Sequence, residues 1–248
     1  MHDWRAEWGY QALFSCCSSK KAGVAILFNN NFAFQLSKSY VDPEGRFVIC
    51  DLNSSGKQIT LANIYAPNND NPNFFPTFFE HLTDFNCEDI IVGDFNLVLD
   101  VKKDKKGGLA RFHYKSLEVI NNFSENLDLV DVGRALNPNS LRYTWRQRKP
   151  EIHCRLDFFL ISQCTLCNTI NADILPGYKT DHSMITLHIS LHSNTRGQWF
   201  WKLNTLFISD KNYVDQINSV IVKTKEEYEK DDTVYPNFPW KMIKMKVR

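Results

Sequence analysis

The sequence predicts an α/β domain, because a strand, a helix and a second strand follow one another near its middle. Residues 58–64 have the composition and flanking turns of a strand. Residues 73–85 carry phenylalanines at intervals of three and four, the spacing of an amphipathic helix with a buried aromatic face. Residues 90–92 are a continuous apolar run, typical of a strand buried on both faces. These phenylalanines are interpreted as core residues rather than as a cofactor site.

The chain before this unit is predicted to be rich in strands. Residues 1–22 are expected to be irregular, and the apolar run at 23–28, closed by three asparagines, is the first strand. Further strands are predicted at 32–36 and 47–52, separated by turn-forming residues. A loop over 65–70 then leads toward the phenylalanine-rich helix.

After the unit, strand-like and helical spacing alternate. A charged loop at 100–108 precedes a helix at 114–127, in which apolar residues recur at helical intervals. Residues 155–161 are predicted to form another buried strand. Residues 129–132 lead out of the helix at 114–127, and the remaining predicted strands are 142–146 and 183–191.

The residue composition of the sequence changes after residue 192. An aromatic stretch, a predicted helix at 207–222 and a charge run at 223–232 follow one another. We therefore predict one domain over 1–192 and a helical, charged linker over 193–248.

Composition points to a soluble protein inside the cell, in the nucleus or the cytoplasm. Of 248 residues, 43% are hydrophobic and 23% charged, and no apolar run approaches the length of a membrane span. The seven cysteines are odd in number and scattered, which does not suggest a disulfide framework. Cys164 and Cys167 form a C-x-x-C pair, but no second pair stands at zinc-site spacing, so no metal or redox role is expected there.

Polar residues mark the ends of several predicted strands. Asp94 and Asn96, spaced by two, can point the same way and hold a water, a metal or a phosphate oxygen, although both residue types also form turns. Asp157 begins an apolar strand and therefore needs a partner, which is either His182 or the nearby Arg155. A bond to His182 would fix the tautomer of the imidazole and raise its basicity.

Basic and aromatic residues give a second candidate surface. Lys102 and Lys103, in a loop that also holds Lys105 and Lys106, could contact phosphates or could form a solvated turn. The net charge of +1 means that nucleic-acid binding would depend on such local patches. Trp145 is expected on a strand with its ring exposed, and a core position is the alternative.

Four ordered motifs give a resemblance that covers nearly the whole chain. They are N-I-Y-A-P-N at 63–68, G-D-F-N at 93–96, R-L-D-F-F-L-I-S at 155–162 and D-H-S at 181–183. The sequence resembles the endonuclease/exonuclease/phosphatase superfamily. The segments at 23–27, 41–46 and 199–204 are similar to the endonuclease region of LINE-type retrotransposon polyproteins.

The resemblance implies a fold and an activity. The fold would be two mixed β-sheets packed face to face with flanking helices, a four-layer sandwich. The activity would be Mg²⁺-dependent hydrolysis of a DNA phosphodiester that leaves a 3′-hydroxyl for a reverse transcriptase. DNA is the implied partner, and the protein is expected to be a monomer with no membrane contact.

The resemblance also implies roles for individual residues. His182 would be the general base or would stabilise the transition state, Asp157 would orient it, and Asp94 would position the attacking water. Tyr65, Asn68 and Asn96 would hold the scissile phosphate. Asp181 would lie close to Mg²⁺, and Trp145 would contact the nucleic acid.

The sequence departs from the family at its beginning. The opening strand, helix and strand of the family are missing, and with them an asparagine and the glutamate that is the main metal ligand; Glu7 lies in the wrong context to replace it. We therefore expect an incomplete Mg²⁺ site, with weak or no nuclease activity. The alternatives are a remnant that binds nucleic acid weakly without cleaving it and a phosphatase of the same superfamily.

Overall fold

A computed structural model of the chain describes residues 4–16, 23–85, 88–108, 113–177, 179–191, 211–228 and 243. The chain separates into two compact units, Met1–Gly197 and Gln198–Arg248. The first unit contains the sheets and the candidate site.

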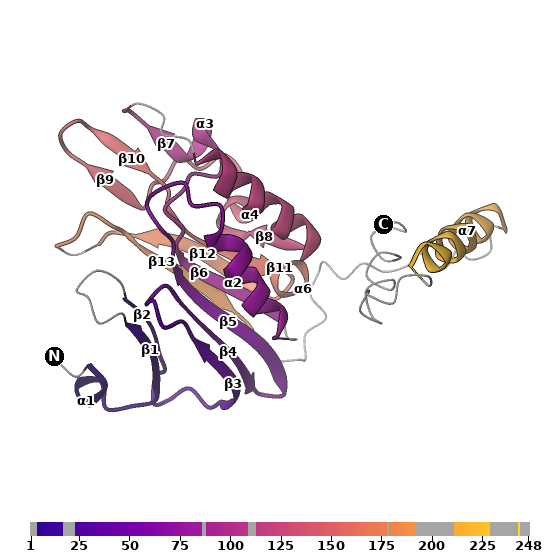
Figure 1. The fold of residues 1–248 in the computed structure, drawn as a ribbon, viewed down its shortest axis with the longest axis horizontal. Coiled ribbons are helices and arrows are strands. Elements are labelled where there is room, and N and C mark those ends of the chain that lie inside the picture. Colours follow the sequence, from indigo (N-terminus) through magenta and orange to yellow (C-terminus); the bar gives the residue numbers. More distant parts are fainter. Residues whose placement is uncertain are drawn as a thin grey trace. The chain divides into compact units, whose positions relative to one another are not determined.

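The centre of the first unit is a six-stranded mixed sheet (Figure 1). In spatial order its strands are β3 (Gln35–Val41), β4 (Phe47–Ser54), β5 (Lys57–Tyr65), β6 (Glu88–Asp94), β11 (Asp157–Ser162) and β8 (Leu129–Asp131). The β5–β6 pair is parallel, and its crossover contains the helix α2 (Phe74–Thr83). The predicted strand, helix and strand are therefore present as an α/β unit.

Helices cover one face of this sheet. α2 and α4 (Tyr114–Asn126) pack their apolar sides against it, and Phe78 and Phe79 of α2 are almost completely buried. The ring of Phe79 stacks on that of Phe123 with 4.3 Å between centroids. Aromatic burial of this extent removes a large apolar area from water, which stabilises the helix–sheet contact.

Strands cover the opposite face. They form two antiparallel hairpins, β1 (Ala12–Cys16) with β2 (Gly23–Leu27), and β12 (Thr169–Leu175) with β13 (Met184–Ile189). Side chains from both hairpins share a core with the sheet, including Ile26, Ala172 and Ile161. Helices, a central sheet and a second layer of strands thus give the expected α/β architecture, with the second layer appearing as two two-stranded sheets in the described residues.

A small three-stranded sheet lies at one end of the unit (Figure 1). It consists of β7 (Lys105–Lys106), β10 (Ile152–Cys154) and β9 (Trp145–Gln147). The short helix α3 (Val101–Asp104) precedes β7, and the Asp100 side chain caps it by accepting the Lys102 N–H. The remaining short helices are α1 (Trp4–Trp8), α5 (Val132–Leu136) and α6 (Gln163–Leu166).

Several local predictions were wrong. Residues 1–22 were expected to be irregular, but their described part, 4–16, contains α1 and β1. The strand expected at 32–36 is β3, which starts at Gln35; the rings of Phe32 and Phe34 precede it and stack on each other. The loop expected at 100–108 contains α3 and β7. The strand expected at 142–146 is β9, which starts at Trp145.

The second unit is described by one helix. α7 (Lys211–Tyr228) includes the described part of the helix predicted at 207–222 and continues into the charge run, whose last residues lie outside the described part. Within the described residues, no helix is both long enough and apolar enough to cross a membrane.

Candidate active site

Three neighbouring strands bring site residues to one end of the central sheet. Tyr65 on β5 pairs with Asp94 on β6, and Asp94 pairs with Asp157 on β11. Residues paired across a sheet project their side chains from the same face. Gly93 permits this arrangement, because it has φ +145° and a Cβ there would lie 2.0 Å from the Ile64 carbonyl oxygen.

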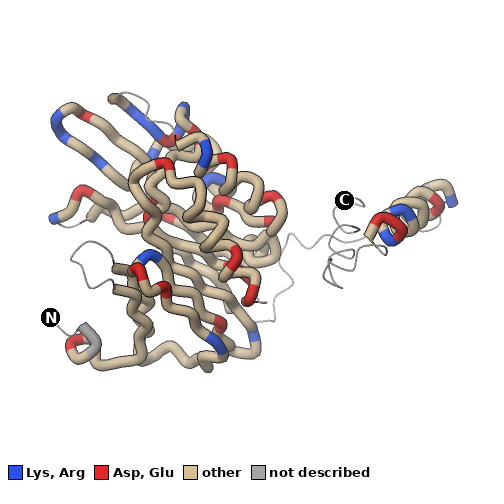
Figure 2. The backbone as a smooth tube through the Cα atoms, viewed as in Figure 1, with Lys and Arg blue, Asp and Glu red and all other residues tan. Residues whose placement is uncertain are grey.

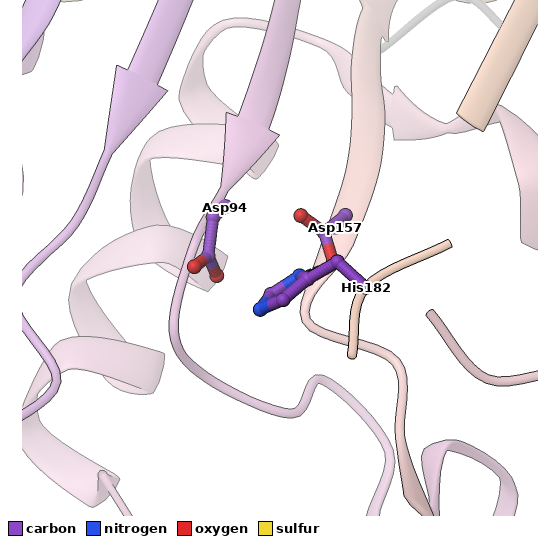
Figure 3. Close-up of side chains that lie close together, drawn as sticks. All are labelled: Asp94, Asp157 and His182. Carbon is purple, nitrogen blue, oxygen red and sulfur yellow. Dashed lines mark hydrogen bonds and ion pairs between the residues drawn. The ribbon is translucent and has the colours of Figure 1, made fainter. Parts of the chain in front are cut away.

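A hydrogen bond joins Asp157 to His182. Asp157 Oδ2 lies 2.9 Å from His182 Nδ1, and the side chains are 15% and 33% exposed (Figure 3). This bond is the main reason why the pKa of His182 is raised above its ordinary value. Because Nδ1 is engaged, Nε2 is the ring nitrogen left to meet a substrate.

Arg155 does not pair with Asp157. Its guanidinium is buried between Asp104 and Asp131, where it donates two hydrogen bonds to each carboxylate. Arg134 shares Asp104 with it. Asp157 is therefore paired with His182 and not with Arg155.

Asp94 lies beside this pair, and the pKa of its carboxyl group is raised above the ordinary value. Burial, followed by the negative charge of Asp157, raises its pKa to about 6, although the Asn96 N–H and His182 oppose the shift. Ligand atoms of Asp94, Asp157 and His182 all lie within 4.8 Å of one another. In Figure 3 the imidazole lies between the two carboxylates. The group thus combines titratable side chains, the carboxyl of Asp94 and the imidazole of His182, with atoms that could bind a cation.

Asn96 follows Asp94 by two residues and is hydrogen-bonded to it. Asn96 adopts φ +51° and donates its backbone N–H to Asp94 Oδ1 at 2.9 Å. Its side-chain amide donates to the Ala66 carbonyl at 2.8 Å, so the loop after β5 is fixed against the end of β6. Asn68 is exposed in that loop.

Sequence reasoning gave Arg46 no role at this site. Its guanidinium lies 5.2 Å from the centre of the Tyr65 ring and donates to the Tyr65 carbonyl at 3.4 Å. Asp42 orients the turn by accepting the Arg46 N–H. The available signal was the position of Arg46 inside one of the quoted motifs.

Asp181 and Trp145 are brought together next to His182. The Trp145 indole N–H donates to Asp181 Oδ2 at 2.9 Å, and Asp181 is exposed. Trp145 is only partly buried, so it is not a core residue. Asp181 lies outside the group formed by Asp94, Asp157 and His182.

Basic residues surround the small sheet that carries Trp145. Lys105 and Lys106 form β7 in that sheet, whereas Lys102 is exposed on α3 and Lys103 donates to the Pro138 carbonyl. Figure 2 shows Lys and Arg positions clustered along β7, α3 and the β9–β10 hairpin. The hairpin adds three cations that sequence reasoning had left out, Arg146, Arg148 and Lys149.

Comparisons with known proteins agree with this picture. No family model matches the chain. It is 27% identical over 223 residues to the transposon TX1 uncharacterized 149 kDa protein of Xenopus laevis, an alignment that covers 86% of this chain and 17% of that protein. The chain thus spans about one sixth of the length of that relative.

Solved structures give the fold. An AP endonuclease from Leishmania major has a TM-score of 0.61 at 18% identity, covering 72% of this chain and 70% of that one. An AP endonuclease from Archaeoglobus fulgidus has a TM-score of 0.59 at 19% identity, covering 77% and 84%. A 3′-5′ exonuclease from Neisseria meningitidis has 0.57 at 18%, covering 74% and 81%. The chain therefore has the endonuclease/exonuclease/phosphatase fold and is similar in sequence to part of a transposon protein.

Proposed function

We propose that this chain is a weakly active Mg²⁺-dependent phosphodiester hydrolase that nicks DNA and leaves a 3′-hydroxyl, as the endonuclease domain of a LINE-type retroelement. The observation that carries the proposal is the group of Asp94, Asp157 and His182 at one end of the sheet. The similarity to a transposon protein and to AP endonuclease structures supports the substrate class.

The residues suit the chemistry of hydrolysis. Attack on a phosphodiester needs a positioned water and relief of negative charge on the phosphate and the leaving group. Asp94, once ionised, would orient the water and accept its proton. His182 would offer Nε2–H to a phosphate oxygen, because Asp157 holds Nδ1 and favours the protonated ring. Tyr65, Asn68 and Asn96 would hold the phosphate.

The carboxylates at this end of the sheet offer oxygen ligands of the kind that a hard cation prefers. Mg²⁺ is usually bound by one or two carboxylates together with substrate phosphate oxygens. Asp94 and Asp181 would hold it, and a bound cation would neutralise phosphate charge. A cation beside Asp94 would also lower the pKa of this carboxyl from its raised value of about 6.

One observation favours a second candidate, nucleic-acid binding without cleavage. Asp157 is engaged with His182 and Asp181 with Trp145, which leaves Asp94 as the site carboxylate that has no side-chain partner among the described contacts. One carboxylate is a weak anchor for a cation in the unbound state. The basic surface around β7 and the β9–β10 hairpin would still bind phosphates.

A plasmid-nicking assay separates the two candidates. Purified protein is incubated with supercoiled DNA in Mg²⁺, beside an EDTA control and His182→Ala. A matched control, Glu118→Gln, neutralises an exposed acid on α4 away from the site. Nicking that needs Mg²⁺ and His182, with ends that a polymerase extends, supports hydrolysis. Salt-dependent DNA binding without nicking supports the second candidate. Release of phosphate from a 3′-phosphorylated oligonucleotide without nicking would instead indicate a phosphatase.

A further inference from the structure

A completely buried threonine, Thr144, lies behind the Asp157–His182 pair. It immediately precedes β9 and has 0% exposure. Sequence reasoning treated it as an ordinary strand residue. A buried hydroxyl is costly unless its hydrogen-bonding capacity is used, so its partners are informative.

The side chain of Thr144 holds the beginning of β11. Its hydroxyl oxygen accepts the backbone N–H of Leu156 at 2.9 Å and that of Asp157 at 3.0 Å. These two bonds use both lone pairs of the oxygen. The Thr144 backbone N–H also donates to the Cys154 carbonyl at 3.0 Å, so the residue is fixed to the same chain segment at two points.

The main chain of Thr144 holds the other half of the pair. Its carbonyl accepts the N–H of Ser183 at 2.5 Å, directly after His182. The next two residues extend the contact, because Trp145 forms a β-bridge with His182 and the Arg146 N–H donates to the Asp181 carbonyl at 3.0 Å.

We propose that Thr144 is a positioning residue that sets the distance between Asp157 and His182. Its hydroxyl fixes the backbone that carries the carboxylate, and its carbonyl fixes the backbone that carries the imidazole. One buried residue thus connects two segments that are 25 positions apart in the chain and holds them within hydrogen-bonding reach. Water has no access to Thr144 and cannot take over these bonds when the hydroxyl is removed.

The test compares variants of matched size. Thr144→Val keeps the shape but leaves two backbone N–H groups without their acceptor, and Thr144→Ser restores the hydroxyl. Thr165→Val is the control, because Thr165 is also buried and loses a hydroxyl bond, to Glu88, away from the site. The readout is the proton resonance of the hydrogen-bonded His182 Nδ1–H, assigned by its loss in His182→Gln.

The resonance should be present in the unmodified protein, in Thr144→Ser and in Thr165→Val, and lost or strongly shifted in Thr144→Val. An unchanged resonance in Thr144→Val overturns the proposal. An equal change in Thr165→Val also overturns it, because the effect would then be general destabilisation. If Thr144→Val does not fold, Thr144→Cys takes its place. The thiol is a weak acceptor, and the proposal fails if Thr144→Cys and Thr144→Ser give the same resonance.

A kinetic consequence rests on the proposed function. Thr144→Val should lower kcat for plasmid nicking on the order of 10²-fold with little change in KM, because a misplaced catalytic group slows the chemical step. Thr144→Ser should restore most of that rate. Failure of every variant to nick DNA would count against the proposed function, whereas the resonance tests the position of the pair independently of activity.

Discussion

Replacing Asp94 by asparagine should remove catalysis and at the same time stabilise the fold at neutral pH. Burial and the charge of Asp157 make the ionised carboxylate unfavourable in the folded protein, which is why its pKa is raised to about 6. Asparagine carries no charge and keeps an oxygen that can accept the Asn96 N–H. Such a trade between stability and activity is expected of a strained catalytic group.

The magnitude follows from the shift in pKa. The pKa rises from 3.8 to about 6, and each unit corresponds to about 1.4 kcal/mol. Partial solvent access reduces this, so we expect Asp94→Asn to raise the free energy of unfolding by about 1–3 kcal/mol at pH 7.5. The sign is fixed by linkage: the folded protein holds the proton more tightly than the unfolded chain, so wild-type stability falls as the pH rises from about 4 to about 6.

Urea unfolding at pH 4.5 and pH 7.5 measures this effect. The gain in Asp94→Asn over the unmodified protein should be larger at pH 7.5 than at pH 4.5, and Glu118→Gln should show no comparable gain. An Asp94→Asn protein that is no more stable at pH 7.5, or whose gain is the same at both pH values, would refute the electrostatic account of the site.

Three further predictions concern packing, pH and DNA binding. Gly93→Ala should destabilise the fold by about 2–4 kcal/mol in urea unfolding, because the new Cβ would lie 2.0 Å from the Ile64 carbonyl oxygen in a positive-φ backbone; an unchanged midpoint would contradict the close approach. The rate of nicking in Mg²⁺ should rise at a pH below about 6, because the cation lowers the raised pKa of Asp94, and should fall again above the raised pKa of His182. A flat profile would remove both residues from the chemistry. Lys106→Gln should weaken DNA binding similarly for all sequences and reduce the salt slope by about 1 in a titration, whereas an unchanged slope would exclude this side chain from phosphate contact.

The strand-helix-strand unit could be predicted from the sequence because its signals are local. The spacing of the phenylalanines in α2 and the apolar run of β6 each report burial within a single element. The Asp157–His182 bond was one of two alternatives, since a charge at the start of a buried strand must find a partner. Choosing between His182 and Arg155 required the fold, because Asp104 and Asp131 lie far from Arg155 in the sequence.

Elements with weak local signals were missed. β1 is a strand of only five residues, and β12 exposes Ile170 while burying Ala172, which obscures the usual alternation. The role of Thr144 was also invisible, because its hydroxyl acts on residues 12 and 13 positions away. These features depend on contacts between residues that are distant in the sequence, and the periodicity of a single segment gives no information about such contacts.

The central claim is that the group around Asp94 and His182 hydrolyses a DNA phosphodiester. The most direct measurement is the initial rate of supercoiled-plasmid nicking in Mg²⁺ for the unmodified protein and for His182→Ala, with folding checked by circular dichroism. We expect nicking that EDTA abolishes and that His182→Ala reduces by about 10²–10⁴-fold. Equal rates for the two folded proteins, or no nicking by the folded unmodified protein, would contradict the claim.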